Sequence, residues 1–264
     1  MRLTGSGLGC ENWPRCGDTF LPPKDYHAYV EFGNRVAGFT VGITTLLAAA
    51  AAFRVPALPR WLFWSAVALP FTVLAQGILG GITVIFELHP LIVMGHFLLS
   101  LLALGLAVFV VLGARDFARP PPSESRLASS WLALALVPSA LALVVSGTLV
   151  TAAGPHSGGE DILRFGNLIE AVHIHIGATA LFGVTFLALV GMLVLERRRA
   201  RTELLLAGAI LALLLVQMAI GEAQWRRGLP WGLVLVHVTV ATTVWVAVVT
   251  LAARIVLRKR ARLA

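Results

Sequence analysis

Three of the histidines inside long apolar stretches of the sequence are candidates for function, because an ionisable side chain is costly there. They are His96, His173 and His237, and each falls within the first two turns of its stretch. Imidazole is a good ligand for iron, and two imidazoles on facing helices can bind heme iron from opposite sides inside a bundle. A hydrogen bond between helices is the alternative role for a single membrane histidine. The recurrence of the position at one depth favours heme ligation, with His173 and His237 as one pair.

Two short segments, each at the head of an apolar stretch, resemble one another. "VEFGNRVAG" runs over residues 30–38 and "IEAVHIHIG" over 169–177, and their alignment places Asn34 opposite His173. Because an amide is a poor heme ligand, the first segment is expected to supply no axial imidazole. His96 would then hold a second heme iron from one side, and the opposite face would stay open or weakly filled for chemistry.

Glu31 lies one helical turn before Asn34 and is expected on the same face of a helix. A carboxylate there could stabilise developing positive charge or manage protons. Its alternative role is an ion pair with Arg35. Both roles remain open at this stage.

The other histidines have simpler interpretations. His175 follows His173 by two residues, so it should point away from His173 and serve packing or hydrogen bonding. We expect solvated loop positions for the remaining three, which are His27, His89 and His156.

These residues require a membrane scaffold. Of 264 residues, 58% are hydrophobic and 13% charged, and the mean hydropathy is +0.86, whereas roughly a quarter of the residues of a soluble domain are charged. Crossing about 30 Å of hydrocarbon takes roughly 20 helical residues, and no strand alternation points to a barrel. The predicted fold is an all-α, polytopic membrane helical bundle of about seven spans. The spans are expected near residues 33–53, 61–85, 91–113, 130–152, 168–195, 204–221 and 230–256.

The net charge of +8 indicates how the chain is oriented in the membrane and does not indicate nucleic-acid binding, because the basic residues gather at alternate span ends. The positive-inside rule puts the richer set, and with it the C-terminus, in the cytoplasm. That set comprises Arg54, Arg60, Arg115, Arg119, Arg126, Arg197, Arg198, Arg199, Arg201, Arg254, Arg258, Lys259, Arg260 and Arg262.

Polar residues recur along the chain in a way that indicates duplication. Gln76 and His96 recur as Gln217 and His237, each pair with an offset of 141, while Glu31 and Asn34 recur as Glu170 and His173 with an offset of 139. A duplicated bundle typically places its sites in equivalent parts of its halves. We therefore expect two repeat-related four-helix halves, residues 1–118 and 130–264, joined by a cytoplasmic linker at 119–129. In this register the first half lacks its leading helix.

Cys10 and Cys16 lie together in the loop "CENWPRC" before the first span. Such a pair could belong to a metal site, although a metal site would require more ligands. A disulfide is favoured because thiols outside the cytoplasm oxidise readily.

Taken together, "RLTGSGLGCENWPRC", "VEFGNRVAG", "HFLLS", "TAAGPHSGGED" and the His173/His237 pair resemble the heme A synthase family, actinobacterial-type members included. These membrane enzymes oxidise a methyl group of heme O to the formyl group of heme A. The resemblance covers nearly the whole chain.

The resemblance implies an eight-helix protein of two halves in a bacterial cell membrane, with its sites near the outer face. Heme b would be the cofactor, held by His173 and His237, and heme O the substrate, held by His96. Glu31 would be catalytic, and Asn34 and Arg35 would lie beside the substrate heme. Asn34 departs from the histidine that the family usually has there.

Further implications concern the partners and the cysteines. The cysteine pair would take part in redox chemistry or heme transfer. Heme O synthase, cytochrome oxidase assembly factors and membrane lipid would be partners, and nucleic acid would not. A non-catalytic heme carrier or b-type electron-transfer protein is the competing function.

Overall fold

The structure is a computed structural model of the 264-residue chain, and it describes residues 6–10, 13–119, 129–155 and 164–260. Most of the predicted linker at 119–129, and His156, lie outside the described residues. Regular structure in the described part is helical, with no β-strand among the elements. The elements are η2 (Ser6–Leu8), α1 (Tyr26–Arg54), α2 (Arg60–Ile85), α3 (Pro90–Ala118), α4 (Ser130–Ala153), α5 (Leu168–Leu195), α6 (Arg201–Arg226) and α7 (Trp231–Arg260).

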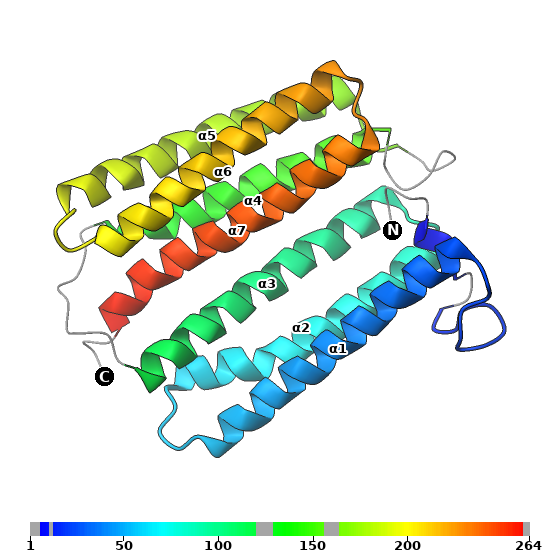
Figure 1. The fold of residues 1–264 in the computed structure, drawn as a ribbon, viewed down its shortest axis with the longest axis horizontal. Helices are drawn as coiled ribbons and strands as arrows, with labels where there is room; N and C mark the ends of the chain where they lie inside the picture. The colour runs from blue at the N-terminus through cyan, green and yellow to red at the C-terminus, as the bar shows by residue number, and fades with distance from the viewer. Residues whose placement is uncertain (1–5, 11–12, 120–128, 156–163, 261–264) are drawn as a thin grey trace. The chain divides into compact units, whose positions relative to one another are not determined.

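All seven α-helices are long and apolar enough to cross a membrane (Figure 1). The predicted all-α, multi-pass fold with seven spans is therefore confirmed for the part of the chain that the structure describes. Six helices begin within three residues of the predicted positions.

The first helix, α1, begins at Tyr26 instead of near residue 33. Asp25 is its N-cap, in an extended conformation, and its carboxylate accepts a 3.0 Å hydrogen bond from the backbone N–H of Ala28. An aspartate cap satisfies one of the N–H groups that a helix start leaves free. The earlier start places Glu31 within the helix, together with Asn34.

The chain forms two compact units. The first unit comprises residues 1–103 and 148–171, and within it α1 packs against α2 and η2 packs against α1. Small side chains line this packing, with Ala49, Ala52 and Ala66 buried. Close approach through small residues is typical of helices in membranes.

The second unit comprises residues 104–147 and 172–264, and in it α6 packs against α7. Helix α5 buries one face through Phe182, Phe186, Leu189 and Leu193. Their spacing of three and four residues makes one stripe along the helix, and the two phenylalanine rings stack with centroids 6.0 Å apart. The boundary between the units runs through α3, α4 and α5, and the two repeat halves inferred from the sequence remain a prediction.

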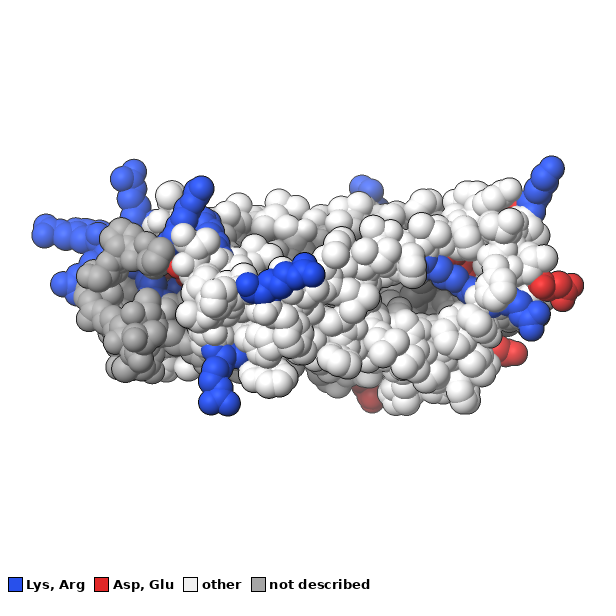
Figure 2. Space-filling view, turned by 90° about the horizontal axis from the view of Figure 1, so that it is seen from below, with Lys and Arg blue, Asp and Glu red and all other residues white. Residues whose placement is uncertain are grey.

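On the face that Figure 2 shows, charged side chains gather mainly toward the two ends of the view, and most of the surface between is uncharged. At the end of the α6–α7 hairpin that carries the C-terminus, Glu203 is fully buried. It pairs with Arg254 at 3.4 Å and with Arg258 at 3.1 Å. Arg258 also donates a 3.0 Å hydrogen bond to the carbonyl of Arg199.

Candidate functional site: seated imidazoles and a clamped disulfide loop

His96 lies in the second turn of α3, and α2 forms a seat for it. The Gln76 amide Nε2 donates a 2.9 Å hydrogen bond to the carbonyl oxygen of His96. One turn further along α2, a Cβ at Gly80 would lie only 3.1 Å from Cε1 of the His96 ring. The imidazole is therefore held against bare backbone, in a space that another residue at position 80 would fill.

His237 lies in the second turn of α7 and has the same seat on α6. Gln217 Nε2 donates to the carbonyl of His237 at 3.0 Å, and a Cβ at Gly221 would lie 3.3 Å from the Cε1 atom of His237. Gln217 and His237 match the repeat register of 141 residues, and Gly221 extends that register by a position that had not been singled out in the sequence.

Each seat contains unpaired buried polar atoms. Nδ1 of His96 and of His237 is buried without a hydrogen-bond partner, and so is Oε1 of Gln76 and of Gln217. Leaving such an atom unpaired costs about 1–3 kcal/mol, so a buried polar group of this kind calls for a further partner. The imidazoles and their glycine cradles are compatible with a flat macrocycle whose iron takes a ring nitrogen.

A third imidazole, His175 on α5, is seated in a similar way on α4. Its Nδ1 lies 3.0 Å from Ser146 Oγ, and a Cβ at Gly147 would lie 3.1 Å from its Cε1 atom. His175 is half-buried and lies two turns before Phe182, on the packed stripe of α5.

His173, in contrast, is exposed. Two residues correspond to about 200° around a helix, so His173 lies on the side of α5 opposite His175. The structure thus holds His175 against α4, in the hydrogen-bonding role expected for it, and leaves the predicted ligand His173 exposed. The register of 141 also matches Asn34 to His175, whereas the alignment on glutamates matched Asn34 to His173.

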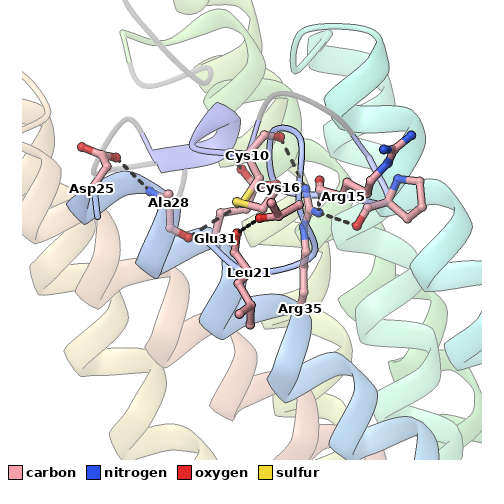
Figure 3. The surroundings of a disulfide bond; sticks show 10 residues. Cys10, Arg15, Cys16, Leu21, Asp25, Ala28, Glu31 and Arg35 are labelled. Atoms are coloured by element: carbon pink, nitrogen blue, oxygen red, sulfur yellow. Dashed lines mark hydrogen bonds and ion pairs between the residues drawn. A yellow bond between two sulfur atoms is a disulfide. The ribbon is translucent and has the colours of Figure 1, made fainter. Parts of the chain in front are cut away.

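The predicted Cys10–Cys16 disulfide is present, and its loop is fastened to α1 (Figure 3). Glu31 Oε2 accepts a 2.8 Å hydrogen bond from the backbone N–H of Cys10. Glu31 Oε1 pairs with the guanidinium of Arg35. The Glu31 side chain is 1% exposed, so the alternative role considered for it, an ion pair with Arg35, is what the structure contains.

Arg35 completes this clamp. Its Nη1 donates to the carbonyls of Pro14 at 3.0 Å and Arg15 at 2.9 Å. Glycine allows the loop to approach the helices closely, since a Cβ at Gly9 would lie 2.3 Å from the backbone of His27. The loop is therefore held by the same carboxylate and guanidinium that the sequence marked as candidate site residues.

Three further predicted positions have simpler surroundings. Asn34 is exposed on α1. His27 is exposed as expected, although its Nδ1 lies 2.9 Å from Ser6 Oγ. His89 is half-buried with a buried Nδ1, so the expectation of a solvated loop residue was wrong. Among the described residues no group of three or more His, Cys, Asp or Glu side chains is placed to hold a metal ion.

Comparison with known proteins identifies the family. The family model COX15-CtaA, described as "Cytochrome oxidase assembly protein", matches residues 24–249. The chain belongs to this family. Its seven spans place this member among multi-pass membrane proteins, and the resemblance noted in the sequence is confirmed.

Relatives of this family member are named "Heme A synthase". The protein from Symbiobacterium thermophilum is 36% identical over 129 residues, which cover 47% of this chain and 42% of the relative. That from Geobacillus thermodenitrificans is 29% identical, covering 48% of this chain and 40% of the relative. The protein from Shewanella oneidensis is 25% identical over 89% of this chain and 84% of its own length. The match thus spans less than half the length of the first two relatives, and no solved structure matches the chain significantly.

Proposed function

We propose that the protein is a heme A synthase, which oxidises a methyl group of heme O to a formyl group by successive hydroxylation for the maturation of cytochrome oxidase. The observation that carries this proposal is the pair of equivalent seats, Gly80 with His96 and Gly221 with His237, each holding an imidazole whose Nδ1 is buried and unpaired. The second unit offers two histidines for heme iron and the first unit only one, a difference that suits one resident heme and one reacting heme.

The second unit is the proposed site of the resident heme b. His237 would supply one axial nitrogen and α5 the other. The sequence prediction named His173, but the seat on Gly147 and the bond to Ser146 favour His175. Ser146 Oγ at Nδ1 would hold the ring so that Nε2 keeps its lone pair for iron. When bound, a bis-histidine heme carries electrons.

The first unit is the proposed site of the substrate, with His96 as the ligand of heme O. Position 34 offers an amide in place of an imidazole, so the iron would be ligated firmly from one side only. Each hydroxylation would replace one C–H bond of the methyl group by a C–OH bond, with the oxygen taken from water and two electrons and two protons passed to an acceptor; after the second, the gem-diol loses water to leave the formyl group.

Glu31 and Arg35 are proposed to act by holding the disulfide loop beside this site. Both carboxylate oxygens of Glu31 are engaged, so a direct catalytic role would require it to leave Cys10 or Arg35 first. The catalytic role of Glu31 remains a prediction, and we propose positioning as its main contribution. The cytoplasmic C-terminus, the outer location of the sites, and heme O synthase and assembly factors as partners are part of the same proposal.

The test is co-expression with a heme O synthase, followed by heme extraction from the purified protein. We expect heme A from the wild type, and loss of heme A with retention of heme b in His96→Ala. His27→Ala, which changes an exposed histidine near the start of α1, should leave both hemes unchanged.

The alternative, a heme carrier or b-type electron-transfer protein, is favoured by one observation: Asn34, an exposed amide, stands where the aligned segment of the second half has a histidine. Under that alternative the wild type binds heme b and yields no heme A under the same conditions.

A further inference from the structure

We propose that Gln217 and Gln76 are positioning residues that fix the tautomer and orientation of His237 and His96. This inference rests on the proposed ligation of heme iron by these histidines. It adds a role for two amides that were otherwise only markers of the repeat.

Each glutamine reaches its histidine from the neighbouring helix. The amide Nε2 bonds to the histidine carbonyl, at 3.0 Å for Gln217 and 2.9 Å for Gln76. This bond fixes the main chain of the turn that carries the imidazole. It also commits the nitrogen of the amide, so that Oε1 is the group left over.

The leftover groups are complementary. In each seat the unpaired buried atoms are an amide oxygen, which only accepts, and an imidazole Nδ1, which donates when it carries the proton. A single buried water between them would satisfy both, as is usual for buried polar atoms. With the proton kept on Nδ1, the lone pair on Nε2 is available for iron.

The amide nitrogen, the histidine carbonyl, the amide oxygen and the imidazole Nδ1 recur together at an offset of 141 residues. This recurrence argues against an accident of packing in one hairpin. The two seats differ in one respect. In the first, Ser100 Oγ also donates to the His96 carbonyl at 3.0 Å and bonds to Gln76; in the second, the corresponding residue is Ala241. The second seat therefore provides the cleaner test, because Gln217 has no hydroxyl beside it to take over.

The chain supplies a matched control in Gln224. It lies on α6 as well, and its Oε1 is buried and unpaired like that of Gln217, but none of the hydrogen bonds described for its side chain reaches a histidine. Replacing either glutamine by methionine keeps side-chain length and removes hydrogen bonding.

The experiment measures the midpoint potential and the electron paramagnetic resonance spectrum of the bound heme in the purified full-length protein. A group that accepts a hydrogen bond from Nδ1–H makes the imidazole a stronger electron donor to iron, which stabilises the oxidised state of the heme. We expect Gln217→Met to raise the midpoint potential and to lower heme affinity about 10-fold. Gln217→Leu, which also removes both polar groups of the amide, should raise the potential in the same direction, and Gln224→Met should match the wild type.

Two results would overturn the inference. One is an unchanged potential and spectrum in Gln217→Met and Gln217→Leu; the other is an equal shift in Gln224→Met. If Gln217→Met fails to fold, Gln217→Leu decides alone, because a potential equal to or below that of the wild type contradicts the proposal. Absence of heme from the wild type would instead contradict the proposed function.

Discussion

The ring of His175 is fastened to the neighbouring helix, with Nδ1 3.0 Å from Ser146 Oγ, whereas His173 two residues earlier is exposed. A hydrogen bond to the second ring nitrogen commonly orients a histidine that binds a metal, and of these two residues His175 has such a bond among those described. We therefore expect His175→Ala to abolish the low-spin heme b spectrum and His173→Ala to retain it. Absorption and magnetic spectra of purified variants make the comparison, and the reverse pattern would restore the assignment made from the sequence.

The glycine seats predict an effect of single methyl groups. Gly221→Ala adds a Cβ 3.3 Å from Cε1 of His237, so the imidazole must shift by a few tenths of an ångström. We expect the purified variant to contain much less heme b per protein than the wild type when heme is supplied in excess. Gly208→Ala on the same helix adds a methyl group with nothing within 4 Å, and it should bind heme normally and gain up to about 1 kcal/mol in stability from helix propensity.

A parallel comparison is available on α2. Gly80→Ala faces His96 at 3.1 Å, while Gly77→Ala meets nothing within 4 Å. Heme A yield on co-expression with heme O synthase should fall for the first and not for the second. Equal yields from both variants would show that the cradle at Gly80 has no part in holding the substrate.

The clamp around Glu31 predicts a coupling between one carboxylate and the disulfide loop. Glu31→Gln weakens the pairing with Arg35 and the bond from the Cys10 N–H, and it should lower the free energy of unfolding by about 1–3 kcal/mol. It should also speed reduction of the Cys10–Cys16 disulfide by a mild thiol. Thermal unfolding in detergent and a thiol-trapping time course measure the two effects.

Glu222 offers the control for this variant, since it forms an ion pair of the same spacing with Arg226, but both side chains are exposed. Exposed pairs contribute about 0–1 kcal/mol, so Glu222→Gln should change neither stability nor reduction rate measurably. A disulfide equally protected in Glu31→Gln would contradict the clamp.

Topology is testable through single cysteines, because both natural cysteines are in the disulfide. We expect Arg198→Cys to react with a membrane-impermeant maleimide only after the cells are opened, since the basic side should be cytoplasmic. Lys24→Cys, on the other side of α1, should react in intact cells. Labelling of Arg198→Cys in intact cells would reverse the predicted orientation.

Hydropathy and charge were sufficient to predict seven spans, because the cost of exposing polar groups to lipid leaves a strong signal along the chain. The start of α1 was missed because the first two turns are polar, and the cap at Asp25 is a local signal that hydropathy does not weigh. The disulfide followed from the cysteine pair alone. The clamp could be predicted only in part: the Glu31–Arg35 spacing is visible, but the bonds to the loop join residues about twenty apart.

The proposed heme ligand on α5 shows a different limit. The short alignment of "VEFGNRVAG" with "IEAVHIHIG" favoured His173, because a shared glutamate dominates nine residues. The register of 141, set by Gln76, Gly80 and His96 against Gln217, Gly221 and His237, points to His175 instead. Which of two histidines faces the bundle depends on a rotation of the helix, and the packed stripe at Phe182 and Leu189 determines that rotation through tertiary contacts.

Helix α1 has 29 residues and is thus about 43 Å long at the usual rise, well beyond the 30 Å or so of hydrocarbon. The turns beyond this length, which include those with Glu31 and Arg35, would lie at the level of the lipid headgroups. Under the proposed function, the charged propionates of the heme substrate would meet the cysteine loop at this level, and its apolar tail would lie among the acyl chains.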